Sequence, residues 1–287
     1  MARYINGGLD RLLIWKIFTS ASNVPYMGGS AGTALAANET SHAYVVESIR
    51  DFTPSGGELT TVVFEGGDKR LGTMQFGDTG KTGFTFTLED IQNSLITALH
   101  GTAIDTTSNS EFEQFSTYAS AASAVAVGVG VVTTLQDRDS GAKKFRTTIF
   151  PSCSIVFSSQ YGGFQGKNTI QASVSVSPSA YHPLGTALSA MSMSLPDNRC
   201  DAFEMITDNR LHMTCFRSNA AAITFVTGYR PLSTTVTADA SPNWFARNGT
   251  DQALSSIVTT TGVATMAAAG TSGDVNVLIY ETNYVAI

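Results

Sequence analysis

Alternating hydrophobic and polar residues recur along most of the chain, and this pattern is typical of half-buried β-strands. In residues 83–88 (GFTFTL), Phe84, Phe86 and Leu88 fall on one face of such a strand and the two threonines on the other. Further strand-like runs cover residues 43–49, 59–64, 71–76, 125–132, 145–151, 153–158, 169–177, 222–227, 234–237, 257–266 and 275–286. Gly-, Pro- and Asp-rich turns separate most of these runs, among them residues 54–57, 65–68, 77–80 and 137–141. The pattern predicts a mainly β protein, an antiparallel β-sandwich whose first strands form successive hairpins.

One segment, near residues 88–100, has the pattern of a helix. Thr87 is the predicted N-cap, acidic residues fill the first turn, and Gly101 follows the end. Apolar residues recur there at three- and four-residue steps, at Leu88, Ile91, Leu95 and Leu99. We therefore expect one α-helix to flank the sandwich.

The texture of the chain changes near Pro196, where Thr- and Ala-rich segments begin. We predict a domain over residues 1–195 and an additional β-rich region over residues 196–287. Residues 21–39, rich in small residues and containing Pro25, are predicted to form a long flexible loop, and residues 102–123 are a second polar segment.

Charged residues make up 14% of the chain, against about 25% in typical proteins, and the net charge is −6. Residues 1–140 hold 8 Lys and Arg against 15 Asp and Glu, and residues 141–287 hold 9 against 8. Such a distribution argues against a protein that grips nucleic acid through its phosphates, because that function needs clustered cations.

The three cysteines, Cys153, Cys200 and Cys215, have spacings that match neither a zinc site nor a disulfide framework. We expect no metal and no cofactor, and synthesis in a reducing compartment. The start of the chain lacks the pattern of a signal peptide, and the apolar run at residues 12–18 is interrupted by Lys16, so we expect no membrane insertion.

Two short motifs match enzyme signatures, but their surroundings do not. Residues 28–32 (GGSAG) fit the nucleophile elbow around Ser30, yet no capped helix follows. Residues 77–82 resemble a phosphate-binding loop, but position 75, where the first glycine is required, is Gln75, and a strand follows. The four histidines, His42, His100, His182 and His212, show no ligand spacing and are interpreted as isolated surface or hydrogen-bonded residues. The sequence predicts no catalytic residues and no enzyme.

Five aromatic residues in the last third of the chain have two interpretations. They are Tyr229, Trp244, Phe245, Tyr280 and Tyr284. They fit a stacking platform for a carbohydrate, but β domains more often use such residues as core or interface anchors, which is the interpretation we favour.

The order of elements resembles the major tail tube proteins of long-tailed, siphovirus-like bacteriophages. The similarity covers residues 40–195 and rests on residues 71–76 (LGTMQF), 83–95 (GFTFTLEDIQNSL), 145–151 and 169–177. It implies a β-sandwich flanked by a helix, and subunits that form rings, expected to be hexameric, which stack into a tube in the virion tail.

The same resemblance implies synthesis in the host cytoplasm, transient non-specific passage of DNA, and tape-measure, tail-terminator or baseplate proteins as partners. An acidic lumen lets a polyanion slide without binding. Glu58, Glu65 and Asp68, in and beside the hairpin at residues 59–76, are the candidates for lumen-facing residues.

Two other classes of protein stay open. A virion adhesin, or another β-structural virion protein that binds host surface glycans, shares the Ser-, Thr-, Gly- and Ala-rich texture. A serine hydrolase acting through Ser30 is the third class.

Overall fold

The computed structural model describes residues 4–19, 25–27, 40–47, 49–55, 59–66, 69–77, 83–88, 126–159, 170–185, 199–218, 223–237 and 242–287. The strands in these ranges are β1 (Tyr4–Thr19), β2 (Pro25–Met27), β3 (Thr40–His42), β4 (Tyr44–Val46), β5 (Ile49–Ser55), β6 (Leu59–Gly66), β7 (Lys69–Gly77), β8 (Gly83–Leu88), β9 (Ala126–Asp137), β10 (Lys143–Ser159), β11 (Ile170–Val176), β12 (Phe203–Thr207), β13 (Arg210–Arg217), β14 (Thr224–Val226), β15 (Asn243–Arg247), β16 (Thr250–Asp251), β17 (Leu254–Ile257), β18 (Val263–Met266) and β19 (Val275–Thr282). All their pairings are antiparallel, which confirms the predicted mainly β, antiparallel fold class.

The predicted helix falls almost entirely outside the described residues. Residues 89–100 are not described, and Leu88 is the last residue of β8, where it pairs with Ile49 and Ile170. Leu88 therefore belongs to the sheet and not to the helical stripe in which the sequence pattern places it.

A nine-stranded sheet runs in the order β2-β1-β9-β10-β11-β8-β5, with β4 added beside β1 and β12 beside β10. The long strand β10 changes partner along its length, from β12 at residues 145–149 to β11 from Cys153 onward. A register shift against β9 lies between Phe150 and Cys153, and it contains Pro151. Proline has no N–H for the ladder, so a bulge is where a strand interior tolerates it, and the bulge bends the strand.

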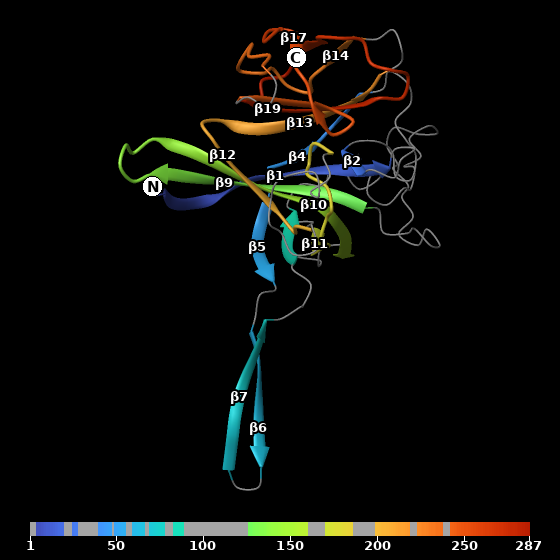
Figure 1. Cartoon of the computed structure of the whole chain (residues 1–287). Coiled ribbons are helices and arrows are strands. Elements are labelled where there is room, and N and C mark those ends of the chain that lie inside the picture. The colour runs from blue at the N-terminus through green and yellow to red at the C-terminus, as the bar shows by residue number, and fades with distance from the viewer. Residues whose placement is uncertain are drawn as a thin grey trace, which may run out of the picture.

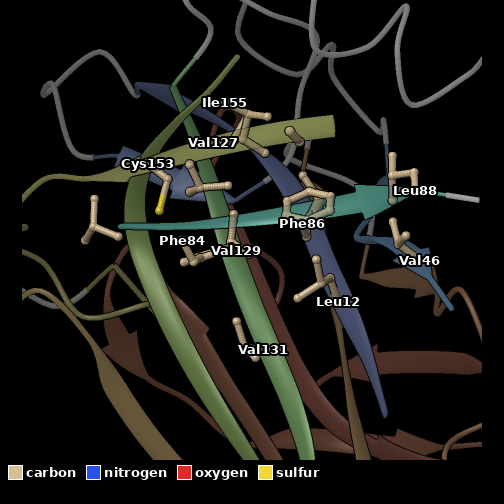
Figure 2. Close-up of a cluster of buried hydrophobic side chains, with 14 residues drawn as sticks. Leu12, Val46, Phe84, Phe86, Leu88, Val127, Val129, Val131, Cys153 and Ile155 are labelled. Carbon is tan, nitrogen blue, oxygen red and sulfur yellow. The ribbon is translucent and has the colours of Figure 1, made fainter. Parts of the chain in front are cut away.

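The alternation read from the sequence places side chains in the core of this sheet. Phe84, Phe86 and Leu88 are buried, whereas Thr85 and Thr87 are half-buried. Phe84, Phe86 and Leu88 pack against residues of β1, β9, β10 and β11 in one cluster (Figure 2). Burying a side chain of this size contributes about 1.5–3 kcal/mol, so this cluster is a principal source of stability.

The strands between Ile49 and Leu88 do not form the predicted series of hairpins. β5 pairs with β8, and β6 pairs only with β7 among the described strands. The β6–β7 hairpin is therefore an insertion between two neighbouring strands of the large sheet, and it extends away from all other sheets (Figure 1).

The C-terminal part of the chain adds two further layers. A five-stranded sheet, β16-β15-β19-β13-β3, packs one face on the large sheet and the other face on a three-stranded sheet, β14-β18-β17 (Figure 1). Because both faces of the middle sheet are covered, all eight residues of its strand β19 are buried. Val277 and Ile279 face one core, and Leu278 and Tyr280 face the other.

Two pairings cross the boundary predicted near Pro196. β12, from residues after it, pairs with β10 of the large sheet, and β3, from residues before it, pairs with β13 of the middle sheet. The predicted loop at residues 21–39 also needs a correction, because Pro25–Met27 form β2 on the edge of the large sheet. Proline is tolerated at the first residue of an edge strand, which explains why Pro25 does not prevent this pairing.

Candidate functional site

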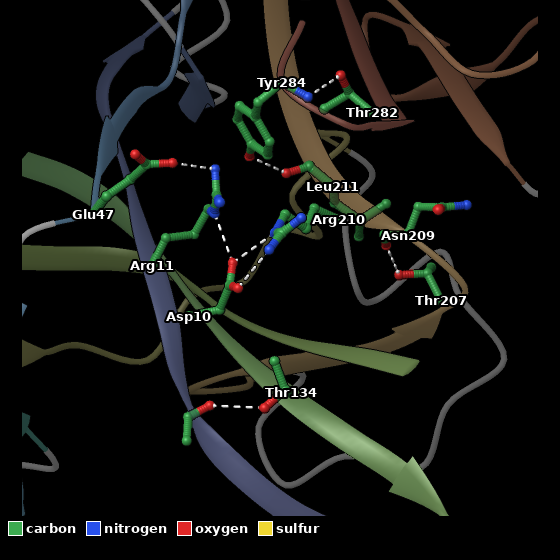
Figure 3. A network of polar contacts seen from close by, with 11 residues as sticks. Asp10, Arg11, Glu47, Thr134, Thr207, Asn209, Arg210, Leu211, Thr282 and Tyr284 are labelled. Carbon is green, nitrogen blue, oxygen red and sulfur yellow. Dashed lines mark hydrogen bonds and ion pairs between the residues drawn. The ribbon is translucent and has the colours of Figure 1, made fainter. Parts of the chain in front are cut away.

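An ion network joins the large sheet to the middle sheet (Figure 3). Asp10 lies on β1 at a register shift between Leu9 and Arg11, so it is an unpaired bulge residue. Its two carboxylate oxygens accept hydrogen bonds from Nε and Nη2 of Arg210, both at 2.8 Å. Arg11 Nε donates to the same carboxylate at 2.7 Å, and Arg11 Nη1 lies 2.8 Å from Glu47. The bidentate pair fixes the orientation of β13 relative to β1.

The electrostatics of this network favour ionised Asp10. Burial alone would raise the pKa of the carboxyl, but the hydrogen bonds from Arg210 and Arg11 outweigh it and lower the pKa to about 2. Asp10 and Glu47 together balance the two guanidinium charges. Asp10 is therefore ionised near neutral pH.

The C-terminal tail, residues 283–287, is attached to the same network through Tyr284. The guanidinium carbon of Arg11 lies 4.1 Å from the centre of the Tyr284 ring, close enough for a cation–π contact. Tyr284 Oη donates to the Leu211 carbonyl at 2.6 Å, and burial raises the pKa of this phenol. Tyr284 therefore ties the tail both to β1 and to β13.

Beside the network, His212 on β13 is completely buried among tyrosine rings. Its ring meets Tyr229, Tyr280 and Tyr284 edge-to-face, at centroid distances of 4.9, 5.7 and 5.6 Å. Neither ring nitrogen has a hydrogen-bond partner in the part of the chain that the structure describes. Burial, with smaller effects from His42 and Arg11, lowers the pKa of His212 to about 3.

His42 approaches the same cluster from β3. Its ring centre is 6.5 Å from that of His212, and its Nδ1 lies 3.1 Å from Thr214 Oγ1. Gly228 covers both rings, since a Cβ atom there would be 3.0 Å from His212 Nε2 and from His42 Cγ. The cluster thus joins β3, β13, β19, the loop after β14 and the C-terminal tail.

These groups have protonation states that do not suit proton transfer near neutral pH. A general acid or base works best when its pKa lies near the operating pH. Asp10 is held ionised, His212 is held neutral, and burial raises the pKa of Tyr280 to about 12. Burial also raises the pKa of Cys153 to about 12, which keeps this thiol from becoming a nucleophile. The arrangement is suited to holding segments together.

The residues singled out in the sequence are only partly described. Glu65 lies near the end of β6, opposite Arg70 of β7. Glu58, Asp68, Ser30 and His100 lie outside the described residues. Glu58, Glu65 and Asp68 all remain lumen candidates by prediction alone.

The structure brings together residues that the sequence analysis treated separately. His42 and His212 are neighbours, and His212 is not hydrogen-bonded as expected but unpaired within the described ranges. His182 does fit the expectation, because its Nδ1 accepts a hydrogen bond from Leu184 N–H at 3.2 Å. Tyr280 and Phe245 are core residues, which confirms the favoured interpretation of the aromatics for these two. The sequence signal at His212 was weak, because residues 210–217 contain as many polar as apolar residues although the six central ones are all buried.

Two other kinds of site are absent from the described part of the chain. Within the described ranges, no three or more His, Cys, Asp and Glu side chains are grouped so that they could hold a metal ion. The described residues also include no helix with the length and apolar character needed to cross a membrane.

Comparisons with known proteins identify no relative of this chain. No family model matches the chain, and neither a curated protein nor a solved structure matches it.

Proposed function

We propose that this chain is a structural virion protein that self-assembles into stacked rings, forming the tail tube through which the DNA of a long-tailed bacteriophage is delivered. In this proposal the protein performs no catalytic step. Its partners are copies of itself and the proteins that measure, terminate or anchor the tube, and DNA passes through without specific binding.

The observation that carries the proposal is the projecting β6–β7 hairpin (Figure 1). An isolated two-stranded hairpin is marginally stable in water at best. Leu59–Gly66 and Lys69–Gly77 nevertheless pair over their length, without a third described strand beside them. Such an element is expected to gain its stability from a surface that it meets in an assembly.

The register of the hairpin makes one of its faces more apolar than the other. Val62 pairs with Met74, and Thr60 pairs with Phe76, so these positions and Phe64 share one face. Thr61 pairs with Gln75 and Val63 with Thr73, so the opposite face mixes polar and apolar positions. A ribbon with one apolar face fits a docking element that lies against a second copy of the chain.

The charge distribution also supports the proposal. The net charge of −6 arises from the first half of the chain, which contains the hairpin. A tube built from such subunits repels the phosphate backbone, and this favours the sliding of DNA over its binding.

The hairpin face can be tested with a double substitution. We expect Val62→Lys with Met74→Lys to raise the subunit concentration needed for assembly by at least about a hundredfold, because two charges would have to be buried in the contact between copies. Sedimentation velocity over a range of concentrations measures this change. Circular dichroism and the melting temperature of the monomer are expected to stay close to wild type, since the hairpin extends away from the three layers.

The matched control places the same charges on the other face. Thr61 and Gln75 are also directly paired, so Thr61→Lys with Gln75→Lys adds the same charge at the neighbouring register position. This variant is expected to assemble like wild type. Equal assembly of the two double variants and wild type would rule out the hairpin as the docking element.

A further inference from the structure

We propose that His212 and the tyrosine rings around it form an acid-sensitive latch, which holds the C-terminal tail on the middle sheet near neutral pH and releases it in acid. This inference does not depend on the proposed function. It assigns a conformational role to a buried histidine that the assembly proposal does not use.

The latch consists of the two segments that cover His212. One is the loop after β14, which contributes Tyr229, and the other is the tail, which contributes Tyr284. These segments bind each other, because Arg230 N–H donates to the Val285 carbonyl at 3.0 Å and the two tyrosine rings lie 4.7 Å apart. Opening the tail therefore exposes His212 to solvent.

Inside the closed latch, a second ring proton would make His212 a cation, and no acceptor among the described residues lies within hydrogen-bond distance of its N–H groups. A buried polar group without a partner destabilises a structure, and a buried charged group without a partner destabilises it more. Both nitrogens of His212 lack a partner among the described residues even in the neutral form. The neutral closed state is thus tolerated, and the charged closed state is strongly disfavoured.

The charged groups around His212 reinforce this preference. From β1, the Arg11 guanidinium stacks on the Tyr284 ring, and Asp10 is already bound by Arg11 and Arg210. From β3, the nearest titratable group is His42, a second potential cation. From β19, Tyr280 faces His212 with its ring.

The acidic group of β19 does not compensate the charge. The register pairs Tyr280 with His212 and Glu281 with Leu211, so Glu281 lies on the opposite face of the sheet. Its carboxylate accepts hydrogen bonds from the backbone and side-chain nitrogens of Asn209. Neither Asp10 nor Glu281 is therefore placed to pair with protonated His212.

The direction of the pH effect follows from proton linkage. The closed latch holds His212 with a pKa of about 3, against an ordinary value of 6.5 when the tail is open. The free-energy preference for the closed tail that comes from His212 is fully present above pH 6.5. It decreases as the pH falls from 6.5 towards 3, because the open state then binds a proton that the closed state does not. At pH 5, the ratio of open to closed tail is expected to be about thirtyfold higher than at pH 7.5.

Hydrogen exchange on the intact chain measures this ratio. The reporters are the amides of Arg230 and Tyr284, which close the latch, and the reference is the amide of Ile279 in the middle sheet. We expect the protection factors of the two reporters to fall by about thirtyfold from pH 7.5 to pH 5 and to stay well below that of Ile279 at both pH values, because Ile279 exchanges only when the middle sheet itself unfolds. Wild-type reporters that keep their protection at pH 5 would overturn the latch.

Two variants assign the effect to His212. His212→Phe keeps an aromatic ring but cannot titrate, so its reporters are expected to change by less than twofold over the same pH range. His182→Asn removes another histidine while keeping an acceptor for Leu184 N–H, and it is expected to respond like wild type. An acid response that persists in His212→Phe would contradict the proposal.

A titration of the wild-type protein provides an answer that needs no variant. In protein with ¹³C-labelled histidine, the His212 signal of the closed state is expected to stay neutral at pH 5. A charged His212 signal should grow only together with unprotected tail amides. A charged His212 in molecules whose tail amides remain protected would exclude the latch.

Discussion

Replacing Trp15 with alanine is expected to lower the free energy of unfolding by about 3–5 kcal/mol. Trp15 is 2% exposed and joins the core between the large sheet and the middle sheet. It pairs with Gly128 of β9, and its indole ring occupies the space that a side chain at Gly128 would need. Removing the ring leaves a cavity that the glycine opposite cannot fill. Urea denaturation measures the loss.

The same contact predicts that a side chain at Gly128 is destabilising too. A Cβ atom at Gly128 would overlap the indole ring, so Gly128→Ala is expected to cost about 1–3 kcal/mol. The matched control is Gly130→Ala, whose Cβ would lie 3.3 Å from Leu13 Cβ and 3.5 Å from the indole, and which should cost less than Gly128→Ala. In the double variant Trp15→Ala with Gly128→Ala, the two losses should not add, because the clash is gone. Fully additive losses would show that the ring does not rest on Gly128.

Asp10→Ala is expected to destabilise the protein by about 3 kcal/mol, because it leaves Arg210 and Arg11 without their shared carboxylate. The side chains of Asp10 and Arg11 are 11% and 8% exposed, so solvent compensates the loss only in part. Chemical denaturation at pH 7 measures the effect. Glu47→Ala is the control, since Glu47 is 63% exposed, and it should cost less than about 1 kcal/mol. Equal losses in the two variants would contradict the role given to Asp10.

The pH dependence of Asp10→Ala gives a second readout. The pKa of Asp10 is lowered from its usual 3.8 to about 2 in the folded protein. Its contribution to stability is therefore present above about pH 4 and is lost as the pH falls towards 2. The difference in stability between wild type and Asp10→Ala should shrink over that range.

Local alternation made part of the fold predictable from the sequence. Phe84, Phe86, Ala172 and Val174 are buried as their period-two pattern indicates. The turn at residues 137–141 was also readable, and there Asp137 accepts hydrogen bonds from Asp139 N–H and the Ser140 hydroxyl. Such signals depend only on neighbours in the chain.

Strand partners were not predictable, because they depend on residues far apart. The pairing of β5 with β8 skips a whole hairpin, and the sequence pattern of a strand does not identify its partner. β19 holds a continuous apolar run at residues 277–280 because both of its faces are covered, so it shows no clear period. In β13, Leu211, Met213 and Cys215 alternate with His212 and Thr214, yet all five are buried, so the polar positions did not mark a solvent-exposed face.

The candidate site was the least predictable part. Asp10 and Arg210 are 200 positions apart, and the carboxylate reaches the arginine only because β1 has a bulge there. His42 and His212 meet across β3 and β13, which belong to different halves of the chain. No spacing in the sequence predicts the Asp10–Arg210 ion pair or the contact between His42 and His212.

Negative-stain electron microscopy of the purified protein at increasing concentration tests the central claim, self-assembly into a tube, most directly. We expect rings and hollow tubes with a lumen wide enough for duplex DNA, and their loss in the variant Val62→Lys with Met74→Lys. Compact particles at every concentration, unchanged by that variant and able to bind cell-surface glycans, would contradict the claim and indicate an adhesin.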